Sequence, residues 1–359
     1  MHEIVIVGGG HAGVQLRGAL AAAGHGARVH LVCEEPVLPY QRPPLSKAYQ
    51  KRADEALQWH RGETWFAEQG ITLHRGDAAA AIDRTARTVT LSGGCVLGYE
   101  WLVLATGTRA RRLPQLPQRL ANVHVLRSAG DAERLRAAWP TAASLTVLGG
   151  GFIGLEVAAT ARALGNAVRV LETAPRLMQR SVSPELSAHV LEVHRASGID
   201  LRTGISIGGF EVRGDRLVSV QAGDERLAVD ALLLGIGAVP EQALAEAAGL
   251  PCDNGIVVDE QMRTADPAVL AIGDCASFPE PTTARRLRLE SVQNANDQAK
   301  AAAATILLMP QAYRALPWFW SEQGSIRLQM AGLAPADGER YRRPGATPTS
   351  TAFRQTDYK

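Results

Sequence analysis

One segment of the sequence occurs twice. Residues 3–34 read EIVIVGGGHAGVQLRGALAAAGHGARVHLVCE, and residues 144–172 read SLTVLGGGFIGLEVAATARALGNAVRVLE. Each copy is a short apolar strand, a glycine turn, a helix rich in Ala and Leu, and a second strand that ends in Glu. This order is typical of a βαβ unit, in which the two strands lie parallel in one sheet. The repeat therefore predicts two α/β domains built on the same plan.

The glycine turn of the first copy has the spacing of a dinucleotide-binding site, with Gly8, Gly10 and Gly13 in the pattern GxGxxG. The first glycine permits a tight turn, the second lets the backbone approach a pyrophosphate, and the third lets the helix pack on the strand. The helix N-terminus favours phosphate by roughly 0.3–1 kcal/mol per contact. Glu34 ends the second strand, where a carboxylate can accept hydrogen bonds from ribose hydroxyls. One such motif is equally typical of a bare turn, but two complete copies favour two nucleotide sites.

The second copy has the same pattern in Gly149, Gly151 and Gly154, and it ends in Glu172. A carboxylate at this place discriminates between nicotinamide cofactors, because NADP carries an extra phosphate on that ribose. At roughly 4 Å the repulsion is about 1 kcal/mol in water-like surroundings and about 4 kcal/mol in a partly shielded site. The sequence therefore favours NADH, with Arg176 as the nearby cation that could still reach a phosphate.

Composition excludes several other classes of protein. The chain has 359 residues and a net charge of +2, so it lacks the basic surplus of a nucleic-acid-binding protein. It enters an apolar run directly after its first residues, with no leader pattern, and its longest apolar stretch, 301–309, is far too short to span a bilayer. The four cysteines lack redox or zinc spacing. We expect a cytoplasmic protein with unpaired thiols. The cysteines are Cys33, Cys95, Cys252 and Cys275.

Two further strand ends carry residues that could contact a cofactor. Gly273 and Asp274 follow an apolar run, and the aspartate could accept hydrogen bonds from a polyol such as a ribityl chain. Ala105, Thr106 and Gly107 end a similar run. A Gly-Asp pair alone is more typical of a turn or a helix cap, so both interpretations stay open.

Seven segments together resemble a known family. They read GGGHAG, PYQRPPLSK (39–47), LVLATG, GGGFIGLE, GIGAVP, AIGD and PWFWSEQG. The combination is similar to the FAD-dependent ferredoxin reductases of the putidaredoxin reductase and aromatic-ring dioxygenase reductase type, in the glutathione-reductase superfamily. The resemblance extends from residue 3 to about residue 333, and PYQRPPLSK is its most specific part. These reductases serve haem-thiolate mono-oxygenases and Rieske-type dioxygenases.

The resemblance implies an α/β fold with two Rossmann-like three-layer nucleotide-binding domains and a small α+β C-terminal domain. We expect an FAD-binding domain in two segments, 1–112 and 239–316, with an NAD-binding domain inserted at 113–238. The C-terminal domain would occupy 317–359. Because the chain stops at Lys359, partway through the family pattern, we expect that domain to be truncated.

The resemblance also assigns roles to individual residues. The catalytic candidates are Lys47, Glu156 and Trp320, with Lys47 paired to Glu156 near the flavin and nicotinamide, and Trp320 at the flavin face turned toward a docked partner. The candidate FAD-binding residues are Gly8, Gly10, Gly13, Glu34, Arg42, Pro43, Pro44, Lys47, Ala105, Thr106, Gly107, Arg111, Gly273, Asp274 and Val292. The candidate NAD-binding residues are Gly149, Gly151, Ile153, Gly154, Glu156, Glu172, Gly235, Ile236 and Gly237.

Elementary chemistry agrees with these roles. Reduced flavin carries negative charge near N1, and a fixed cation such as Lys47 stabilises it. Without the motif, Lys47 would be an ordinary surface lysine, Glu156 a helix residue favoured by the dipole, and Trp318 and Trp320 simple packing residues. The family usually has Asn where this chain has Glu241, which puts that nicotinamide contact in doubt.

The favoured function is electron transfer from NADH through FAD to an acidic 2Fe–2S ferredoxin. The ferredoxin would dock near Trp320 and a cluster of arginines, with a second basic cluster further along, although arginine is common throughout this chain. One alternative is direct reduction of a small molecule such as monodehydroascorbate, oxygen or a quinone. Another is an interaction flavoprotein like apoptosis-inducing factor. The first cluster is Arg285, Arg286 and Arg288, and the second is Arg340, Arg342 and Arg343.

Overall fold

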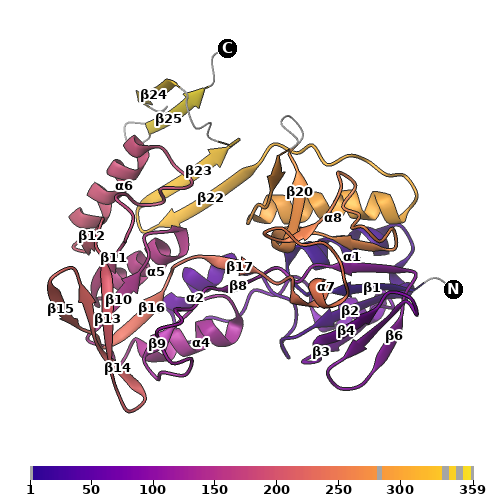
Figure 1. Cartoon of the computed structure of the whole chain (residues 1–359), viewed down its shortest axis with the longest axis horizontal. Coiled ribbons are helices and arrows are strands. Elements are labelled where there is room, and N and C mark those ends of the chain that lie inside the picture. The colour runs from indigo at the N-terminus through magenta and orange to yellow at the C-terminus, as the bar shows by residue number, and fades with distance from the viewer. Residues whose placement is uncertain (1–2, 281–284, 334–338, 345–350, 357–359) are drawn as a thin grey trace. The chain divides into compact units, whose positions relative to one another are not determined.

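The computed structural model describes residues 3–280, 285–333, 339–344 and 351–356. The chain divides into two compact units, each assembled from separate chain segments (Figure 1). Unit 1 consists of Met1–Arg42, Leu57–Arg109 and Ala238–Phe319. Unit 2 consists of Pro43–Ala56, Ala110–Gly237 and Trp320–Lys359. Each unit therefore depends on contacts between segments that are far apart in the sequence.

Unit 1 is built on a five-stranded parallel sheet. All four residues of β1 are buried, as expected for a parallel strand with both faces covered. Helix α1 (His11–Ala22) follows β1 and leads back to β2, so the first copy of the repeat forms the predicted βαβ unit. The strand order is β19 (Val269–Ala271), β7 (Trp101–Leu104), β1 (Ile4–Val7), β2 (Val29–Cys33) and β3 (Thr72–Arg75).

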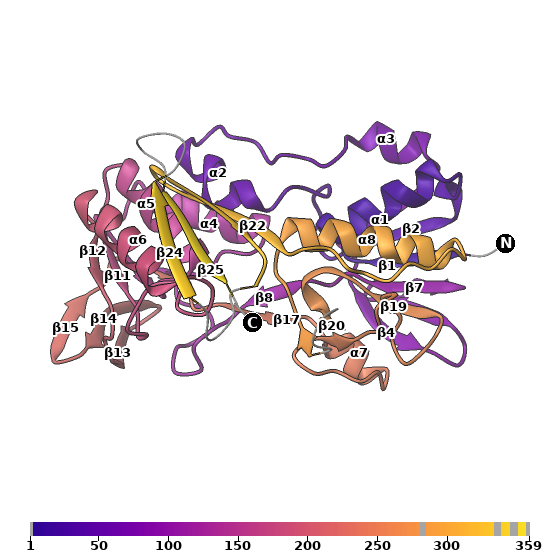
Figure 2. The ribbon, with the colours of Figure 1, turned by 90° about the horizontal axis from the view of Figure 1, so that it is seen from above.

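A second helix packs beside α1 in unit 1. Helix α8 (Val292–Ile306) runs along α1 (Figure 2), and an added Cβ at Gly273 would lie 3.0 Å from Cβ of Ala12 in α1 and 3.9 Å from Cβ of Ala295 in α8. The remaining elements of the unit are an antiparallel sheet, a second small sheet and short helices. They are β4 (Ala79–Asp83), β5 (Thr88–Leu91), β6 (Val96–Gly98), β18 (Ile256–Val257), β20 (Ala276–Pro279), β21 (Arg286–Leu287), α3 (Glu63–Glu68), α7 (Ala243–Ala247), η1 (Gly26–Arg28) and η3 (Gly273–Cys275).

Unit 2 repeats the plan of unit 1 with a second five-stranded parallel sheet. Helix α5 (Phe152–Ala163) joins β10 to β11, and a three-stranded antiparallel sheet again accompanies the parallel one. The parallel order is β12 (Asp200–Arg202), β11 (Ala167–Leu171), β10 (Ser144–Leu148), β16 (Ala231–Leu234) and β9 (Val123–His124). The antiparallel strands are β13 (Ile207–Arg213), β14 (Arg216–Ala222) and β15 (Glu225–Ala228).

The last described strands of unit 2 include a hairpin of β22 (Trp318–Gln323) and β23 (Ile326–Ala331), whose Ile326 and Leu328 join the buried core around β10 and α5. The first two residues of β22 belong to unit 1. The two sheets and their helices confirm the α/β fold with two Rossmann-like cores. The other elements of unit 2 are α2 (Ala48–Lys51), η2 (Pro43–Ser46), α4 (Ala129–Ala138), α6 (Pro184–Ala196), β24 (Glu339–Pro344) and β25 (Thr351–Thr356). Strand β17 (Ala238–Pro240) belongs to unit 1 and pairs with β8 (Thr108–Ala110), whose last residue belongs to unit 2.

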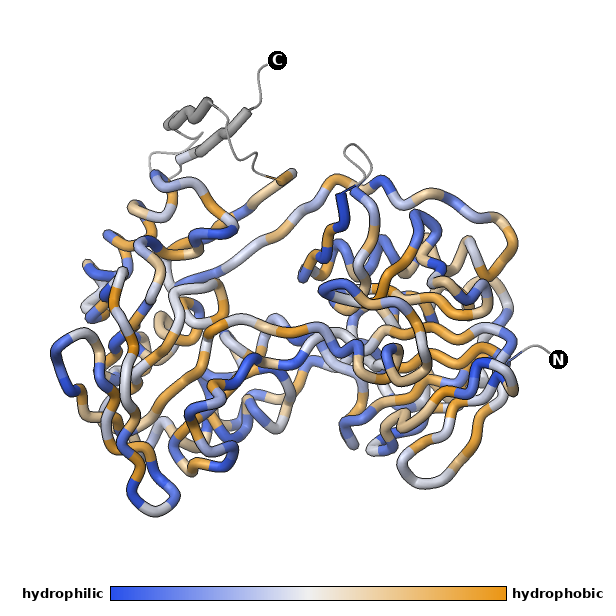
Figure 3. The backbone as a smooth tube through the Cα atoms, viewed as in Figure 1, coloured by the Kyte–Doolittle hydropathy of each residue, from blue (hydrophilic) through white to orange (hydrophobic). Residues whose placement is uncertain are grey.

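Polar caps fix where the helices begin. Ser183 accepts a hydrogen bond from the backbone of Leu186 and is followed by Pro184, so α6 begins at Pro184. Ser291 accepts one from Asn294, which starts α8 at Val292. The hydrophobic strands of both sheets stand out in Figure 3. Among the described residues no helix is both long and apolar enough to cross a membrane.

Acid should destabilise the folded chain. Burial lowers the pKa of His124 and His194 below the ordinary value of 6.5, and it lowers the pKa of His60 to about 4. Because these folded-state values lie below the unfolded ones, the unfolded chain binds more protons as the pH falls below about 6.5. We expect the free energy of unfolding to decrease from pH 7 to pH 5, as measured by urea titration. A His60→Gln variant should show a smaller decrease, and an equal decrease would contradict this assignment.

Candidate functional site

The first glycine turn lies between β1 and α1 in unit 1. Gly8 has a φ of +120°, and a Cβ there would overlap the carbonyl oxygen of Ala105. A Cβ at Gly13 would overlap the carbonyl oxygen of Gly8. At Gly10, in contrast, an added Cβ has no described protein atom within 4 Å. Gly8 and Gly13 are thus required by the fold, whereas Gly10 leaves open space at the N-terminus of α1.

The second glycine turn has the same construction between β10 and α5. Gly149 has a φ of +105°, and its Cβ would overlap the carbonyl oxygen of Gly235. A Cβ at Gly154 would collide with Gly149, but one at Gly151 would have its nearest described neighbour, the oxygen of Gly235, at 3.9 Å. Gly10 and Gly151 are the N-caps of α1 and α5, and within the described residues neither helix has a side-chain cap. Both helix ends therefore offer backbone N–H groups to an anion.

Glu172 is tied to the second glycine turn. Its Oε2 accepts a hydrogen bond from the backbone N–H of Gly150 at 2.5 Å, and its Oε1 accepts one from Ala174 at 2.7 Å. The guanidinium of Arg176 donates to the carbonyls of Val182 and Gln179 at 2.6 and 2.7 Å. Arg176 is thus held by backbone oxygens, while Glu172 presents a carboxylate at the turn.

The strand-end acids of the two copies are not equivalent. Gly149 N–H donates to the carbonyl of Leu171, the residue before Glu172, and Gly8 N–H donates to the carbonyl of Val32, the residue before Cys33. Cys33 therefore takes the place of Glu172, and Glu34 follows it as an exposed side chain. Burial raises the pKa of the Cys33 thiol to about 12, so this residue stays protonated.

Arg42 is paired with a residue that sequence reasoning missed. Its guanidinium lies 3.1 Å from Glu35 Oε1, and Tyr40 donates its hydroxyl to both oxygens of the same carboxylate at 2.9 and 3.0 Å. Glu35 was hidden because the repeat directs attention to Glu34. The signal in the sequence was the group Glu35, Tyr40 and Arg42, an acid, an aromatic and a cation that directly precede PPLSK.

Three more candidate sets lie at strand ends. Thr106 Oγ1 donates to the carbonyl of Glu241 at 2.6 Å, and Glu241 N–H donates to Gly107 at 2.9 Å. The Glu241 carboxylate lies 3.3 Å from Arg109. Glu241 thus fixes the segment after β7 through its backbone and its side chain. Gly273 N–H donates to Gln298 of α8 at 2.7 Å, which fixes the 3-10 turn that contains Asp274.

The other candidates lie on both units. Ala105 contacts the first glycine turn, and Val292 is the first residue of α8 in unit 1. Arg111 N–H donates to the carbonyl of Gly237 at 2.9 Å in unit 2. Ile153 is exposed on α5, and Trp320 is half-buried on β22. Gly235 and Ile236 follow β16 directly.

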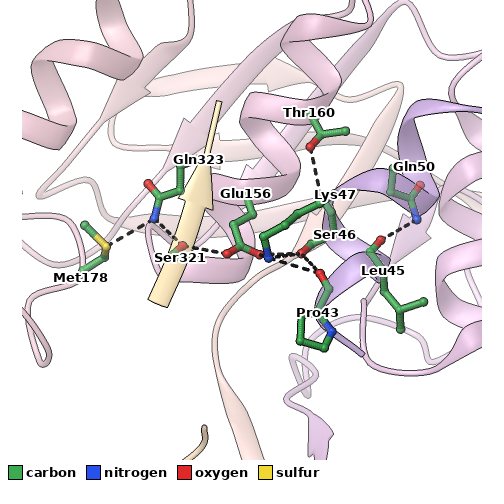
Figure 4. A network of polar contacts seen from close by, with 10 residues as sticks. All are labelled: Pro43, Leu45, Ser46, Lys47, Gln50, Glu156, Thr160, Met178, Ser321 and Gln323. Atoms are coloured by element: carbon green, nitrogen blue, oxygen red, sulfur yellow. Dashed lines mark hydrogen bonds and ion pairs between the residues drawn. The ribbon is translucent and has the colours of Figure 1, made fainter. Parts of the chain in front are cut away.

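Lys47 and Glu156 meet in unit 2 (Figure 4). Lys47 Nζ lies 2.7 Å from Glu156 Oε2, and it also donates to the carbonyl of Pro43 at 3.2 Å. The side chain of Glu156 is 3% exposed and that of Lys47 18%. Ser46 donates to the same Oε2 at 2.5 Å, and Ser321 donates to Oε1 at 2.7 Å. A buried carboxylate is thus matched by one cation and two hydroxyl groups.

The arginines of the first basic cluster are engaged in local contacts. Arg288 is 10% exposed, pairs with Glu290 at 2.7 Å and donates to the backbone carbonyl of Asp274 at 3.1 Å. Arg286 is exposed and donates to the carbonyl oxygens of Val258 and Ser277. Arg285 is also exposed. The side chains of Arg340, Arg342 and Arg343 lie outside the described residues.

Comparison with known proteins agrees with this geometry. The family model described as pyridine nucleotide-disulphide oxidoreductase matches residues 2–299. Rhodocoxin reductase of Rhodococcus erythropolis is 44% identical over 92% of this chain and 78% of its own length. Putidaredoxin reductase CamA of Pseudomonas putida is 43% identical over 92% of this chain and 80% of its own length.

Solved structures show the same relationship. The ferredoxin reductase for the CYP199A2 system of Rhodopseudomonas palustris aligns with a TM-score of 0.95 at 40% identity, over 99% of this chain and 88% of its own. The covalent putidaredoxin reductase–putidaredoxin complex aligns with a TM-score of 0.92 at 40% identity, over 99% and 87%. The family model and these relatives show that the chain belongs to the pyridine nucleotide-disulphide oxidoreductase family and is an oxidoreductase. Within that family it groups with ferredoxin reductases of the putidaredoxin reductase type.

The described residues fit the two cofactors that this family implies, a flavin and a nicotinamide nucleotide. Each glycine turn leaves room where a side chain would otherwise stand, at Gly10 and at Gly151. Each also presents a helix N-terminus without a side-chain cap among the described residues. These are the features that a dinucleotide pyrophosphate requires.

Proposed function

We propose that this protein is a flavoprotein reductase that carries electrons from NADH, through FAD, to a 2Fe–2S ferredoxin serving a mono-oxygenase or a ring-hydroxylating dioxygenase. The observation that carries the proposal is the pair of matching glycine turns, one in each parallel sheet, with open space at Gly10 and Gly151. The ferredoxin reductases among its relatives support the acceptor.

The two nucleotides have separate binding segments in this proposal. FAD would be bound by the first glycine turn, the segment after β7 and the turn that contains Asp274, within segments 1–112 and 239–316. NADH would be bound by the second glycine turn and Glu172, within segment 113–238. A bound flavin accepts a hydride from the nicotinamide and passes the electrons on one at a time.

Lys47 and Glu156 would act where the hydride is transferred. Lys47 supplies a fixed cation for the negative charge that develops on reduction, and Glu156 keeps that ammonium group in one position. The 2.7 Å contact between them and the burial of Glu156 support this division of roles. Trp320 would contact the flavin on the side of the partner, as the resemblance implies.

The properties of the cysteine thiols disfavour a disulfide-reducing mechanism. Burial raises the pKa of the thiols of Cys33 and Cys275, and burial also raises that of Cys252 to about 11. All four cysteines are free in the structure. Because the thiolate is the reactive species, these residues are poor nucleophiles at neutral pH. Direct reduction of monodehydroascorbate, oxygen or a quinone needs no thiol and remains the second candidate.

The partner is proposed to be acidic. Arg285 and Arg286 are exposed and suit a docking surface, whereas Arg288 holds Asp274 and is better kept unchanged. Charge steering raises an association rate and fades as the Debye length falls from about 30 Å at 0.01 M salt to about 10 Å at 0.1 M. The salt dependence of ferredoxin reduction therefore reports on this surface, with a small dye as the acceptor for comparison.

A panel of acceptors tests the proposal. Purified protein is supplied with NADH and, in turn, with several 2Fe–2S ferredoxins, oxygen, a quinone and monodehydroascorbate. We expect at least one ferredoxin to be reduced with a higher kcat/KM than any small acceptor. Rapid turnover of a small acceptor with no reduction of any ferredoxin would replace this function by the direct-reductase alternative.

Glu172 should set the choice of nicotinamide nucleotide. We expect the native enzyme to prefer NADH, and Glu172→Gln to reduce the ratio of kcat/KM for NADH over NADPH. Repulsion of about 1–4 kcal/mol corresponds to a factor of at least about five. Glutamine retains an oxygen for the Gly150 N–H but offers no second oxygen to the Ala174 N–H, so the thermal unfolding of the variant is recorded alongside. The control is Glu192→Gln, the same charge change on the exposed face of α6. Comparable kcat/KM for both nucleotides in the native enzyme would contradict the assignment.

A further inference from the structure

The second half of strand β22 buries two polar side chains. Ser321 and Gln323 are 0% and 1% exposed, whereas Glu322 between them is exposed. This alternation follows the two-residue period of a strand. A buried polar side chain carries a cost unless it is hydrogen-bonded, so two consecutive inward positions occupied by Ser and Gln require an explanation.

Both residues belong to a hydrogen-bonded chain that ends at Glu156 (Figure 4). Ser321 Oγ donates to Glu156 Oε1 at 2.7 Å. Gln323 Nε2 donates to Ser321 Oγ at 3.1 Å. At the far end, His194 Nε2 lies 2.9 Å from Gln323 Oε1. The chain thus joins α6, β22 and α5 within unit 2 and reaches Lys47 through the carboxylate.

The donors in this chain can be assigned. Gln323 donates its two amide hydrogens to Ser321 Oγ and, at 3.7 Å, to Met178 Sδ. Its oxygen therefore accepts a hydrogen bond from His194, whose neutral imidazole carries its hydrogen on Nε2. Because Ser321 accepts from Gln323, its own hydrogen is directed to Glu156. Glu156 then accepts a hydrogen bond from Ser321 on Oε1, and hydrogen bonds from Ser46 and Lys47 on Oε2. Every link has one direction, so the carboxylate is held in a single orientation.

We propose that Ser321 and Gln323 are positioning residues that hold the Glu156 carboxylate in the orientation in which it pairs with Lys47, with His194 as the anchor of the chain. The kinetic consequence rests on the proposed function, because it concerns hydride transfer at Lys47. The pairing itself is a property of unit 2 and can be measured without turnover. A merely structural role for β22 would instead predict loss of stability with the Lys47–Glu156 pair unchanged.

The lysine ammonium groups provide a direct measurement. The chain has four lysines, Lys47, Lys51, Lys300 and Lys359, so ¹⁵N-lysine labelling of the protein as isolated gives few side-chain signals. The signal of Lys47 is assigned by its absence in Lys47→Arg. An ammonium group held by hydrogen bonds exchanges its protons slowly with water. We expect Ser321→Ala to speed exchange at Lys47 by about tenfold, the size of one hydrogen bond to a charged group. Gln323→Met removes a bond to a neutral hydroxyl group and should speed exchange about fivefold.

Two comparisons make this measurement specific. Ser321→Thr retains the hydroxyl group and should retain slow exchange at Lys47. Glu322→Gln, on the exposed face of the same strand, should also leave it unchanged. The signals of the exposed Lys51 and Lys300 should be the same in all variants. Wild-type exchange at Lys47 in both Ser321→Ala and Gln323→Met would overturn the proposal, whatever the enzyme reduces.

A double-mutant cycle tests the kinetic consequence. FAD reduction by NADH is followed by stopped flow in Ser321→Ala, Glu156→Gln and the double variant. If Ser321 acts through Glu156, its replacement slows reduction about tenfold in the native background and has no further effect in Glu156→Gln. An equal slowing in both backgrounds would contradict the proposal. Failure of NADH to reduce the wild-type protein would instead refute the proposed function, while the exchange experiment still decides whether Ser321 and Gln323 position Glu156.

Discussion

Gly10→Val should yield a folded but colourless protein. An added Cβ at Gly10 meets no described protein atom within 4 Å, so the substitution costs the fold little, yet it fills the space reserved for the pyrophosphate of FAD. We expect complete loss of the flavin absorbance in the purified protein, and no uptake of added FAD, with the circular dichroism spectrum retained. The native protein should be yellow and release free FAD on heating.

Matched substitutions show that this effect comes from the ligand. Gly18→Ala, in the same helix, also meets no described atom within 4 Å and should leave FAD bound. Gly151→Val, the equivalent change in the second turn, should give a yellow protein that NADH no longer reduces. Gly8→Ala should fail to fold, because its Cβ would overlap the backbone of Ala105. A Gly10→Val protein with a full complement of FAD would remove the first glycine turn from the cofactor site.

Lys47→Met should slow the reduction of FAD by NADH about 100-fold, the usual effect of removing one preorganised charge at a developing anion. NADH binding should change much less, because Lys47 acts on charge that appears during reduction and therefore affects rate more than affinity. The measurement is anaerobic stopped flow over a range of NADH concentrations, which separates the limiting rate from the apparent dissociation constant.

The matched control is Lys51→Met, which removes an exposed lysine from α2, four residues further along the chain. Its reduction rate should equal that of the native enzyme. Because Lys47→Met leaves the buried Glu156 without its cation, thermal unfolding and FAD content should be recorded alongside. An unchanged limiting rate in a folded, FAD-loaded Lys47→Met protein would exclude Lys47 from the mechanism.

The parallel sheets were predictable because their signals are local. An apolar strand, a glycine turn and a helix follow one another in the sequence, and the backbone geometry of Gly8 and Gly149 follows from that order. The starts of α4 and α6 also have local signals, since Ser128 and Ser183 cap them. The extension of the repeat to matching antiparallel sheets was not visible, because those strands share no sequence between the copies.

The resemblance predicted that Lys47 pairs with Glu156, and the two side chains lie 2.7 Å apart. The hydroxyl groups that share this carboxylate could not be predicted, because they come from distant segments: Ser46 precedes Glu156 by 110 residues and Ser321 follows it by 165. Local sequence patterns indicate the spacing of apolar residues and the position of turns. They do not indicate which donor will contact a given buried oxygen. The signal in the sequence was the alternation in WSEQ, where Ser and Gln occupy inward positions that usually hold apolar residues. The equivalence of Cys33 in the first copy to Glu172 in the second was also not visible in the sequence, because it depends on how each strand pairs with its glycine turn.

The central claim is that electrons pass from NADH through this protein to a ferredoxin. The direct test is anaerobic sequential-mixing stopped flow, in which the FAD-loaded protein is first mixed with one equivalent of NADH and then with an oxidised 2Fe–2S ferredoxin. We expect loss of the oxidised flavin absorbance in the first step. In the second step the ferredoxin absorbance should bleach while the flavin absorbance returns, and lower salt should speed this transfer. A protein that NADH reduces fully, but that returns no electrons to any ferredoxin while oxygen or a quinone reoxidises it rapidly, would contradict the account.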